Sequence, residues 1–298
     1  MIKKFLDYVE ITTKITSVFP FLMAVAYLLL MKQPIHAGLT LLFFASMFLF
    51  DLTTTAINNY MDTKSNGQSL PFKRKTGLYI IVCLFAVSTA LGIYLACLTD
   101  VVVLLLGGLC FLCGVLYSYG PLPISHLPLG EFFSGIFYGL LIPFILFYMN
   151  MPKGTYFTLN LQDWQLTLGL APLAAILLLA IPPICLTANI MLANNICDVE
   201  KDVLVKRYTL AYYLGKRALY LFALLYYLPY LAMVIMVGTG ILPALCLVSL
   251  ITIIPVQRNI NRFMKKQEKA TTFILAVKNY VIVMAVHTLM IFISGLFH

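Results

Sequence analysis

The stretch LGLAPLAAILLLAIPPICLTANIMLANNICDVEKD, residues 168–202, decides the fold of this chain. Residues 168–195 are almost continuously apolar, and this run is long enough to cross the roughly 30 Å hydrocarbon core of a bilayer as a helix. The polar segment NNICDVEKD (194–202) then ends the run with two amides and three acids. The stretch predicts a membrane-spanning helix that carries carboxylates at one membrane surface.

The composition extends this prediction to the whole chain. Of the 298 residues, 62% are hydrophobic and only 10% are charged, whereas a soluble domain carries about 25% charged residues. The apolar surplus must face lipid, and long continuous runs favour helices over a β-barrel. We therefore predict an all-α membrane protein, a single domain over 1–298, with nine transmembrane helices. The predicted spans are 13–31, 38–62, 76–98, 101–118, 131–149, 168–195, 217–237, 240–257 and 272–296.

The distribution of Lys and Arg predicts the orientation. All of the 20 basic residues except Lys32, Lys153 and Lys278 fall at the span ends that share a side with the N-terminus. Since cytoplasmic loops accumulate Lys and Arg, we expect a multi-pass protein of the cell membrane with a cytoplasmic N-terminus. The net charge of +9 is explained by this topology and by anionic lipid, and it gives no reason to expect a nucleic-acid partner.

Two of the predicted helices end in matching polar ladders. In the second span Asn58, Asp62 and Asn66 recur every four residues, and in the sixth Asn194, Asp198 and Asp202 do the same. At helical spacing each set shares one face. Both helices run in the same direction, so both ladders arrive at the cytoplasmic surface.

These ladders indicate a cation site. Acids at a helix C-terminus meet the negative end of the helix dipole, and oxygen ligands suit Mg²⁺, which commonly bridges protein carboxylates to substrate phosphates. The predicted metal ligands and catalytic residues are Asp62, Asp198, Asp202 and Asn58. The alternative is that both segments are ordinary solvated helix ends. Lys73, Arg74, Lys206 and Arg207 either clamp a diphosphate or only set the topology.

Three other features stay open at this stage. Asp51, a costly charge within the second span, either lines a cavity below the ladders or is a hydrogen-bonded packing residue. The loop 119–131, which contains His126, is either a lid or a plain connector. Lys278 either snorkels to the surface or contacts a substrate.

The motifs resemble those of the UbiA superfamily of intramembrane prenyltransferases. The first family motif, NDxxDxxxD, stands here as NNYMDTKSN (58–66), and the second, DxxxD, stands as DVEKD (198–202). The segments 194–217 and 117–133 are similar to the branch that prenylates 1,4-dihydroxy-2-naphthoate in menaquinone synthesis. Asn59 and Asn66 replace family acids, and Cys197 replaces an arginine of that branch.

The resemblance implies nine helices around a central cavity open to the cytoplasm. It also implies Mg²⁺-dependent transfer of a polyprenyl group from its diphosphate to an aromatic acceptor. The implied acceptor is 1,4-dihydroxy-2-naphthoate, which loses carbon dioxide and gives demethylmenaquinone. The expected substrate contacts are Asn59, Asn66, Lys73, Arg74, Asn194, Asn195, Arg207, Tyr60, Tyr117 and Tyr119. The sequence fixes neither the prenyl length, the general base nor the oligomeric state.

Three alternatives stay open beside this expectation. One is a family member that uses another aromatic acceptor. Another is a degenerate member that binds a prenyl lipid without turnover, because two motif acids are amides. The third is a transporter that uses Asp51 and Lys278 in its pathway. Transporter sites usually lie near the bilayer midplane, whereas the acids of this chain cluster at one surface, which favours the enzyme.

Overall fold

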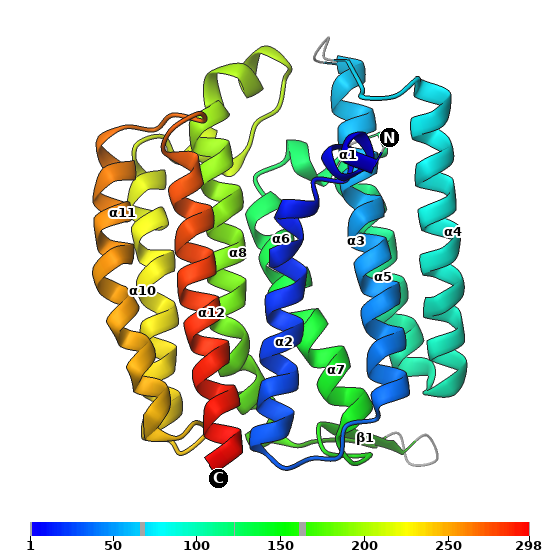
Figure 1. Ribbon diagram of the computed structural model, residues 1–298, viewed down its shortest axis with the longest axis vertical. Coiled ribbons are helices and arrows are strands. Elements are labelled where there is room, and N and C mark those ends of the chain that lie inside the picture. The colour runs from blue at the N-terminus through cyan, green and yellow to red at the C-terminus, as the bar shows by residue number, and fades with distance from the viewer. Residues whose placement is uncertain (1, 66–68, 122, 161–164, 298) are drawn as a thin grey trace.

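The helices of the computed structural model, which describes residues 2–65, 69–121, 123–160 and 165–297, follow the hydropathy pattern of the chain. Within these residues, nine helical segments are long and apolar enough to cross a membrane. The fold is therefore the predicted multi-pass helical membrane fold, and Figure 1 shows the segments side by side, running up and down. These segments are Ile11–Leu30, Ala37–Thr63, Arg74–Leu98, Val101–Ser118, Gly130–Asn150, Leu170–Leu204, Arg217–Gly238, Ala244–Lys265 and Phe273–Phe297.

Short helical pieces and one hairpin complete the order of elements. The bounds are α1 (Ile2–Tyr8), η1 (Ile11–Lys14), α2 (Ile15–Leu30), α3 (Ala37–Ser65), α4 (Arg74–Leu98), α5 (Val101–Ser118), η2 (Ile124–His126), α6 (Gly130–Ile136), η3 (Phe137–Leu141), α7 (Ile142–Asn150), β1 (Phe157–Asn160), β2 (Gln165–Leu168), α8 (Leu170–Leu204), α9 (Leu210–Leu214), α10 (Arg217–Gly238), η4 (Ala244–Thr252), α11 (Ile253–Lys265) and α12 (Phe273–Phe297).

The span limits differ from the predicted ones where polar sequence continues a helix. Helix α8 runs to Leu204 and α11 to Lys265, beyond the apolar runs that end at 195 and 257, because a helix does not need lipid to persist past the membrane surface. The antiparallel β1–β2 hairpin was not predicted. Its register pairs Phe157 with Leu168, so Leu168 ends a strand rather than beginning the sixth span.

Close helix packing brings α8 against the fifth span. A Cβ atom added at Gly139 would lie 2.3 Å from the backbone nitrogen of Ile184, and one at Gly135 would lie 2.9 Å from the carbonyl oxygen of Ile184. The two glycines are four residues apart, which is the small-xxx-small spacing that lets membrane helices approach closely. This contact holds α6 and the π-helical turn η3 on α8, the helix that carries the second ladder.

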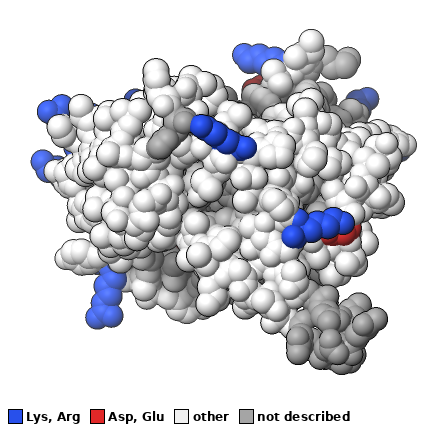
Figure 2. Space-filling view, turned by 90° about the horizontal axis from the view of Figure 1, so that it is seen from below, with Lys and Arg blue, Asp and Glu red and all other residues white. Residues whose placement is uncertain are grey.

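The bundle has two chemically different ends. Helices α3 and α8 both finish at the end drawn at the top of Figure 1, called here the site end, and the β1–β2 hairpin lies at the other, the hairpin end. Figure 2 looks onto the hairpin end and shows a largely uncharged face with scattered Lys and Arg side chains. The predicted charge asymmetry along the chain thus corresponds to a real asymmetry of the bundle.

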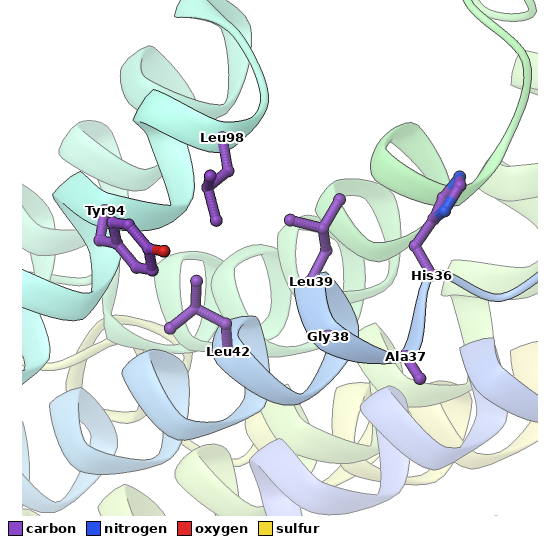
Figure 3. A pocket seen from close by; sticks show the side chains of 7 residues that line it. All are labelled: His36, Ala37, Gly38, Leu39, Leu42, Tyr94 and Leu98. Atoms are coloured by element: carbon purple, nitrogen blue, oxygen red, sulfur yellow. The ribbon is translucent and has the colours of Figure 1, made fainter.

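A pocket of about 610 Å³ lies near the hairpin end. It is lined mainly by apolar side chains of α3 and α4, among them Leu39, Leu42 and Leu98, with Tyr94 and His36 at its edge (Figure 3). It carries no carboxylate and is at the opposite end of α3 from Asp62. It is therefore unsuited to a metal or diphosphate. The central cavity open at the site end stays a prediction.

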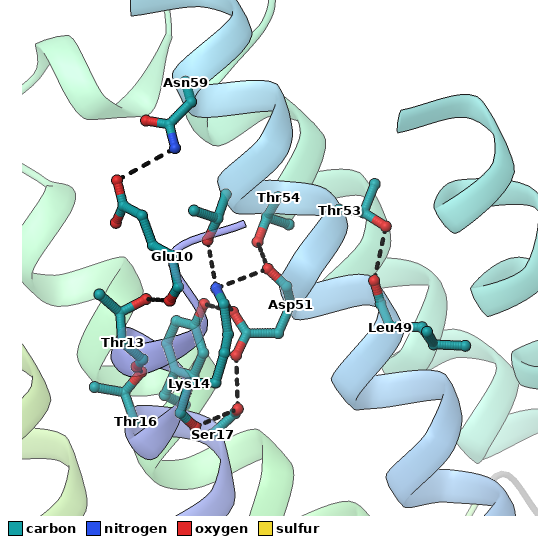
Figure 4. A network of polar contacts seen from close by, with 12 residues as sticks. Glu10, Thr13, Lys14, Thr16, Ser17, Leu49, Asp51, Thr53, Thr54 and Asn59 are labelled. Carbon is teal, nitrogen blue, oxygen red and sulfur yellow. Dashed lines mark hydrogen bonds and ion pairs between the residues drawn. The ribbon is translucent and has the colours of Figure 1, made fainter. Parts of the chain in front are cut away.

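A charged network is buried inside the bundle (Figure 4). Asp51 accepts hydrogen bonds from Lys14 Nζ at 3.0 Å, Ser17 Oγ at 2.6 Å and Tyr138 OH at 2.7 Å. The network joins η1, α2, α3 and η3, so Asp51 is a hydrogen-bonded packing residue. Lys14, which the topology prediction counted as a cytoplasmic charge, is only 3% exposed.

Candidate active site

The first ladder lies on one face of α3, as its spacing predicts. Asn58 Nδ2 donates a hydrogen bond to Asp62 Oδ2 at 3.2 Å, and Ser118 Oγ at the end of α5 donates to Asn58 Oδ1 at 2.9 Å. Ser118 was missed by the sequence reasoning, since a lone serine at a helix end carries no specific signal. Asn66 lies outside the described residues.

Asn59 is engaged with the N-terminal segment. Its amide Nδ2 donates to the Tyr8 carbonyl at 2.9 Å and to Glu10 Oε1 at 3.2 Å, and Figure 4 shows the second of these contacts. The side chain that stands in place of a family acid therefore supplies two donors to a neighbouring segment. A carboxylate could make neither bond.

The basic residues Lys73 and Arg74, at the start of α4, differ in their surroundings. Arg74 stacks on the Tyr60 ring at 4.2 Å and donates to the Tyr60 carbonyl at 3.0 Å. Lys73 is exposed at the start of α4, and Tyr119 is also largely exposed. The structure thus brings Arg74 of α4 against Tyr60 of α3.

The second ladder already holds a cationic side chain. Lys269 Nζ, from the loop between α11 and α12, lies 2.6 Å from Asp198 Oδ2 and also donates a hydrogen bond to Asn194 Oδ1. A single ammonium contacts both oxygens, so Asn194 and Asp198 share one face. The sequence reasoning counted Lys269 only as a topology charge, and nothing in the spacing connects it with a residue 71 positions earlier.

The end of α8 turns back on itself and places Arg207. Lys206 adopts a left-handed conformation with φ of 59°, and the Arg207 backbone N–H bonds the Asp202 carbonyl at 2.9 Å, a helix end that usually uses glycine. The guanidinium then lies 4.0 Å from Asp202 Oδ1. Asp202 is 8% exposed, and its Oδ2 atom has no hydrogen-bond partner among the described residues.

Arg207 also fixes the loop before α6. Its Nε atom donates to the Ser125 carbonyl at 2.8 Å, and the backbone N–H of Tyr208 donates to the His126 carbonyl at 3.2 Å. The described part of the loop 119–131 is therefore attached to the end of α8, next to the second ladder. A role of this loop as a lid stays a prediction.

The polar ends of α3 and α8 lie at the same end of the bundle (Figure 1). Arg207 lies 4.0 Å from Asp202 Oδ1, and Lys269 lies 2.6 Å from Asp198 Oδ2, one turn earlier on α8. His126 is half-buried between the two ends. Burial lowers the pKa of His126 and the charge of Arg207 lowers it further, while the charge of Asp62 opposes this shift. The predicted carboxylates thus lie at the same end of the bundle, although they come from helices more than 100 residues apart in the sequence.

Asn195 belongs to a different cluster from Asn194. Its Nδ2 atom donates to Glu131 Oε1 at 2.8 Å, and both side chains are buried, at 2% and 4% exposure. Tyr117 OH lies 3.5 Å from the Met191 sulfur on the same side of α8. Glu131, which the sequence reasoning left without a role, holds α6 to α8 beneath the second ladder.

The donor set fits a hard cation that is shared with a substrate. Within the described residues, no three His, Cys, Asp or Glu side chains converge closely enough to hold one ion by themselves. Oxygen ligands are nevertheless present at both helix ends, including the unpartnered Asp202 Oδ2 and the Asn194–Asp198 pair that already accepts a cation. Mg²⁺ keeps waters and takes one or two carboxylates plus substrate phosphates, which agrees with this open arrangement.

Comparisons with known proteins place the chain among helical membrane prenyltransferases. Residues 17–286 match the model of the UbiA prenyltransferase family. The chain is 31% identical over 216 residues to the 1,4-dihydroxy-2-naphthoate octaprenyltransferase of Bacillus subtilis (strain 168), and the match covers 67% of this chain and 64% of that relative. The chain therefore aligns with slightly less than two thirds of that relative's length.

Solved structures share the fold. The apo structure of a UbiA homologue from Aeropyrum pernix K1 has a TM-score of 0.67 at 18% identity, with 91% of this chain and 96% of that one covered. A UbiA homologue from Archaeoglobus fulgidus, solved with DMAPP and Mg²⁺, has a TM-score of 0.61 at 12% identity, with 95% and 99% covered. At these identities the likeness establishes the arrangement of helices alone.

Proposed function

Because the chain belongs to the UbiA prenyltransferase family, we propose that it transfers a polyprenyl group from polyprenyl diphosphate to an aromatic acceptor. The proposed acceptor is 1,4-dihydroxy-2-naphthoate, with loss of its carboxylate as carbon dioxide and formation of demethylmenaquinone. The name of the Bacillus relative supports this choice. The observation that carries the proposal is that α3 and α8, which carry Asp62 and Asp202, finish at the same end of the bundle, where Arg207 lies 4.0 Å from Asp202 Oδ1.

The proposed metal ligands are the predicted ones: Asp62 with Asn58 on α3, and Asp198 with Asp202 on α8. Mg²⁺ bound there would offset the negative charge that develops on the departing diphosphate. Arg207 is already oriented by its bonds to Ser125 and Asp202. Its planar set of donors suits a diphosphate oxygen pair, so we assign it to substrate binding.

When the bond between the prenyl carbon and the diphosphate oxygen breaks, the diphosphate takes the electron pair and the prenyl group remains as an allylic cation, which water would capture in an open site. Tyr117 lies on α5, and its hydroxyl lies 3.5 Å from the sulfur of Met191 on α8. An aromatic face can stabilise a cation, so we assign Tyr117 to this role. The loop 119–131, attached to α8 through Arg207, would exclude water above it.

The transporter alternative loses its main support. Asp51 is buried and hydrogen-bonded to Lys14, Ser17 and Tyr138, whereas Lys278 is exposed on the outside of α12. The two residues therefore do not contribute to a shared polar pathway. We propose that the site end faces the cytoplasm. Most Lys and Arg residues of the chain lie near this end, and cytoplasmic loops accumulate Lys and Arg.

The test is a reaction of the purified full-length protein in detergent with a long-chain polyprenyl diphosphate, Mg²⁺ and 1,4-dihydroxy-2-naphthoate. Mass spectrometry measures demethylmenaquinone. We expect product from the wild type and a loss of at least about 100-fold in Asp198→Ala, since removing a charged stabilising group typically costs two to three orders of magnitude in rate.

Glu200→Ala is the matched control, because Glu200 is exposed on the same turn of α8 and lies off the ladder face. Its activity should equal that of the wild type. Diphosphate release without the naphthoate product would reassign the acceptor within the same reaction class. Absence of both products in folded protein would overturn the proposal and favour a lipid-binding member.

A further inference from the structure

Lys269 contacts two oxygens of the second ladder. Its Nζ atom lies 2.6 Å from Asp198 Oδ2 and also bonds Asn194 Oδ1. It also lies 4.9 Å from the centre of the Phe273 ring. The ammonium thus contacts Asp198, which the proposed function assigns to the metal, and Asn194, which is among the substrate contacts expected from the sequence.

The loop that carries Lys269 is an ordered turn built around Glu268. The backbone nitrogens of Thr271, Thr272 and Phe273 all donate to the Glu268 carbonyl, at 3.3, 2.9 and 3.1 Å. The Thr272 hydroxyl accepts from the Glu268 backbone N–H at 2.8 Å. This turn fixes the backbone beside the end of α8, so the reach of Lys269 to Asp198 depends only on its flexible side chain.

A neighbouring lysine shows that this placement is not a general property of the loop. Lys266 pairs with Glu268 at 2.7 Å, and its side chain is 67% exposed. The Lys269 side chain is 41% exposed and that of Asp198 is 19% exposed. The loop therefore presents two lysines of the same type, of which one contacts the ladder and the other contacts only its own loop.

We propose that Lys269 is a positioning residue that acts as an internal counter-cation. In the metal-free protein its ammonium keeps the Asn194 and Asp198 side-chain oxygens directed toward the same point. A divalent ion that binds to these oxygens must displace the ammonium. The displaced side chain stays within reach of the diphosphate that the ion would hold. This inference rests on the proposed function, because it takes Asn194 and Asp198 as part of the metal and diphosphate site.

Competition between two cations sets the expected size of the effect. The Lys269 side chain is 41% exposed, so its ion pair with Asp198 contributes little free energy, and a divalent ion can displace the ammonium. Neutralising Lys269 would remove this competition. We expect Mn²⁺, used as the probe ion, to bind about twofold to fivefold more tightly to Lys269→Met than to the wild type.

The experiment titrates Mn²⁺ into the full-length protein in detergent without any prenyl diphosphate and follows free Mn²⁺ by electron paramagnetic resonance. Lys266→Met is the matched control and should bind Mn²⁺ like the wild type, and so should Lys269→Arg, which keeps the charge. Equal or weaker Mn²⁺ binding by Lys269→Met would overturn the inference while leaving the proposed function intact. If the wild type binds no Mn²⁺, the assigned metal site and the inference fall together.

A second measurement needs no variant. An amine-reactive reagent should label Lys269 more slowly than Lys266 in the metal-free protein, and Mg²⁺ should raise the labelling of Lys269 alone. Mass spectrometry of the digested protein reports both sites. Labelling of Lys269 that does not respond to Mg²⁺, in protein shown to bind the ion, would contradict displacement.

Discussion

The ammonium of Lys14 lies 3.0 Å from the carboxylate of Asp51, inside the bundle, where each side chain is 4% exposed. Replacing Asp51 by Asn should therefore leave a buried cation without its counter-charge. We expect this change to lower the free energy of unfolding by about 3–5 kcal/mol. Thermal unfolding in detergent measures the loss.

The double variant Lys14→Met/Asp51→Asn provides the control, because it removes both charges. It should be more stable than Asp51→Asn alone, whereas Lys4→Met, at an exposed position, should change little. A double variant no more stable than the single one would show that the ion pair is not the source of the effect.

Restoring the family acid at position 59 should weaken this protein. Asn59 Nδ2 donates to the Tyr8 carbonyl and to Glu10 Oε1, and an aspartate there would face two acceptors. We expect Asn59→Asp to cost about 1 kcal/mol in stability, and we expect no tighter Mn²⁺ binding. Adding Glu10→Gln, which returns a donor, should recover part of the stability. An Asn59→Asp variant that is more stable than the wild type, or that binds Mn²⁺ more tightly, would contradict this account.

A methyl group at Gly139 should disrupt the packing of η3 on α8. The added Cβ would lie 2.3 Å from the Ile184 nitrogen, and backbone cannot give way as a flexible side chain can. We expect Gly139→Ala to lower the free energy of unfolding by about 1–3 kcal/mol. Gly108→Ala is the control, because a Cβ there meets no atom within 4 Å. Equal melting temperatures for the two variants would argue against the close contact.

Acid should destabilise the site end through His126. Burial and the charge of Arg207 lower the pKa of His126 below its ordinary 6.5, so the folded protein resists protonation that the unfolded chain accepts. Stability should therefore fall as the pH drops below about 6.5 and level off below the lowered pKa. Melting temperatures of the wild type and His126→Gln between pH 7.5 and 5 test this, and parallel curves would exclude His126 as the source.

Much of the fold could be predicted because lipid imposes a simple rule on the chain. Backbone groups in a bilayer must be paired within a helix, so apolar runs of sufficient length report the spans directly. The limits at α8 and α11 were wrong because hydropathy records where lipid ends, not where the helix ends. The β1–β2 hairpin was missed because its strands are only four residues long and the second strand overlaps the start of the predicted sixth span at Leu168.

The sequence by itself determined the spans, the two ladders and the end of the bundle at which they meet, because these depend on local period and on the direction of each helix. Only the tertiary structure decided what each polar group contacts. Lys14 pairs with Asp51, Asn59 donates a hydrogen bond to Glu10, and Lys269 pairs with Asp198. Such contacts depend on how helices and loops that are distant in the sequence pack together. The partner of a long, flexible lysine side chain is set by which residues lie near it in the folded protein, and the spacing of residues along the chain does not indicate that partner.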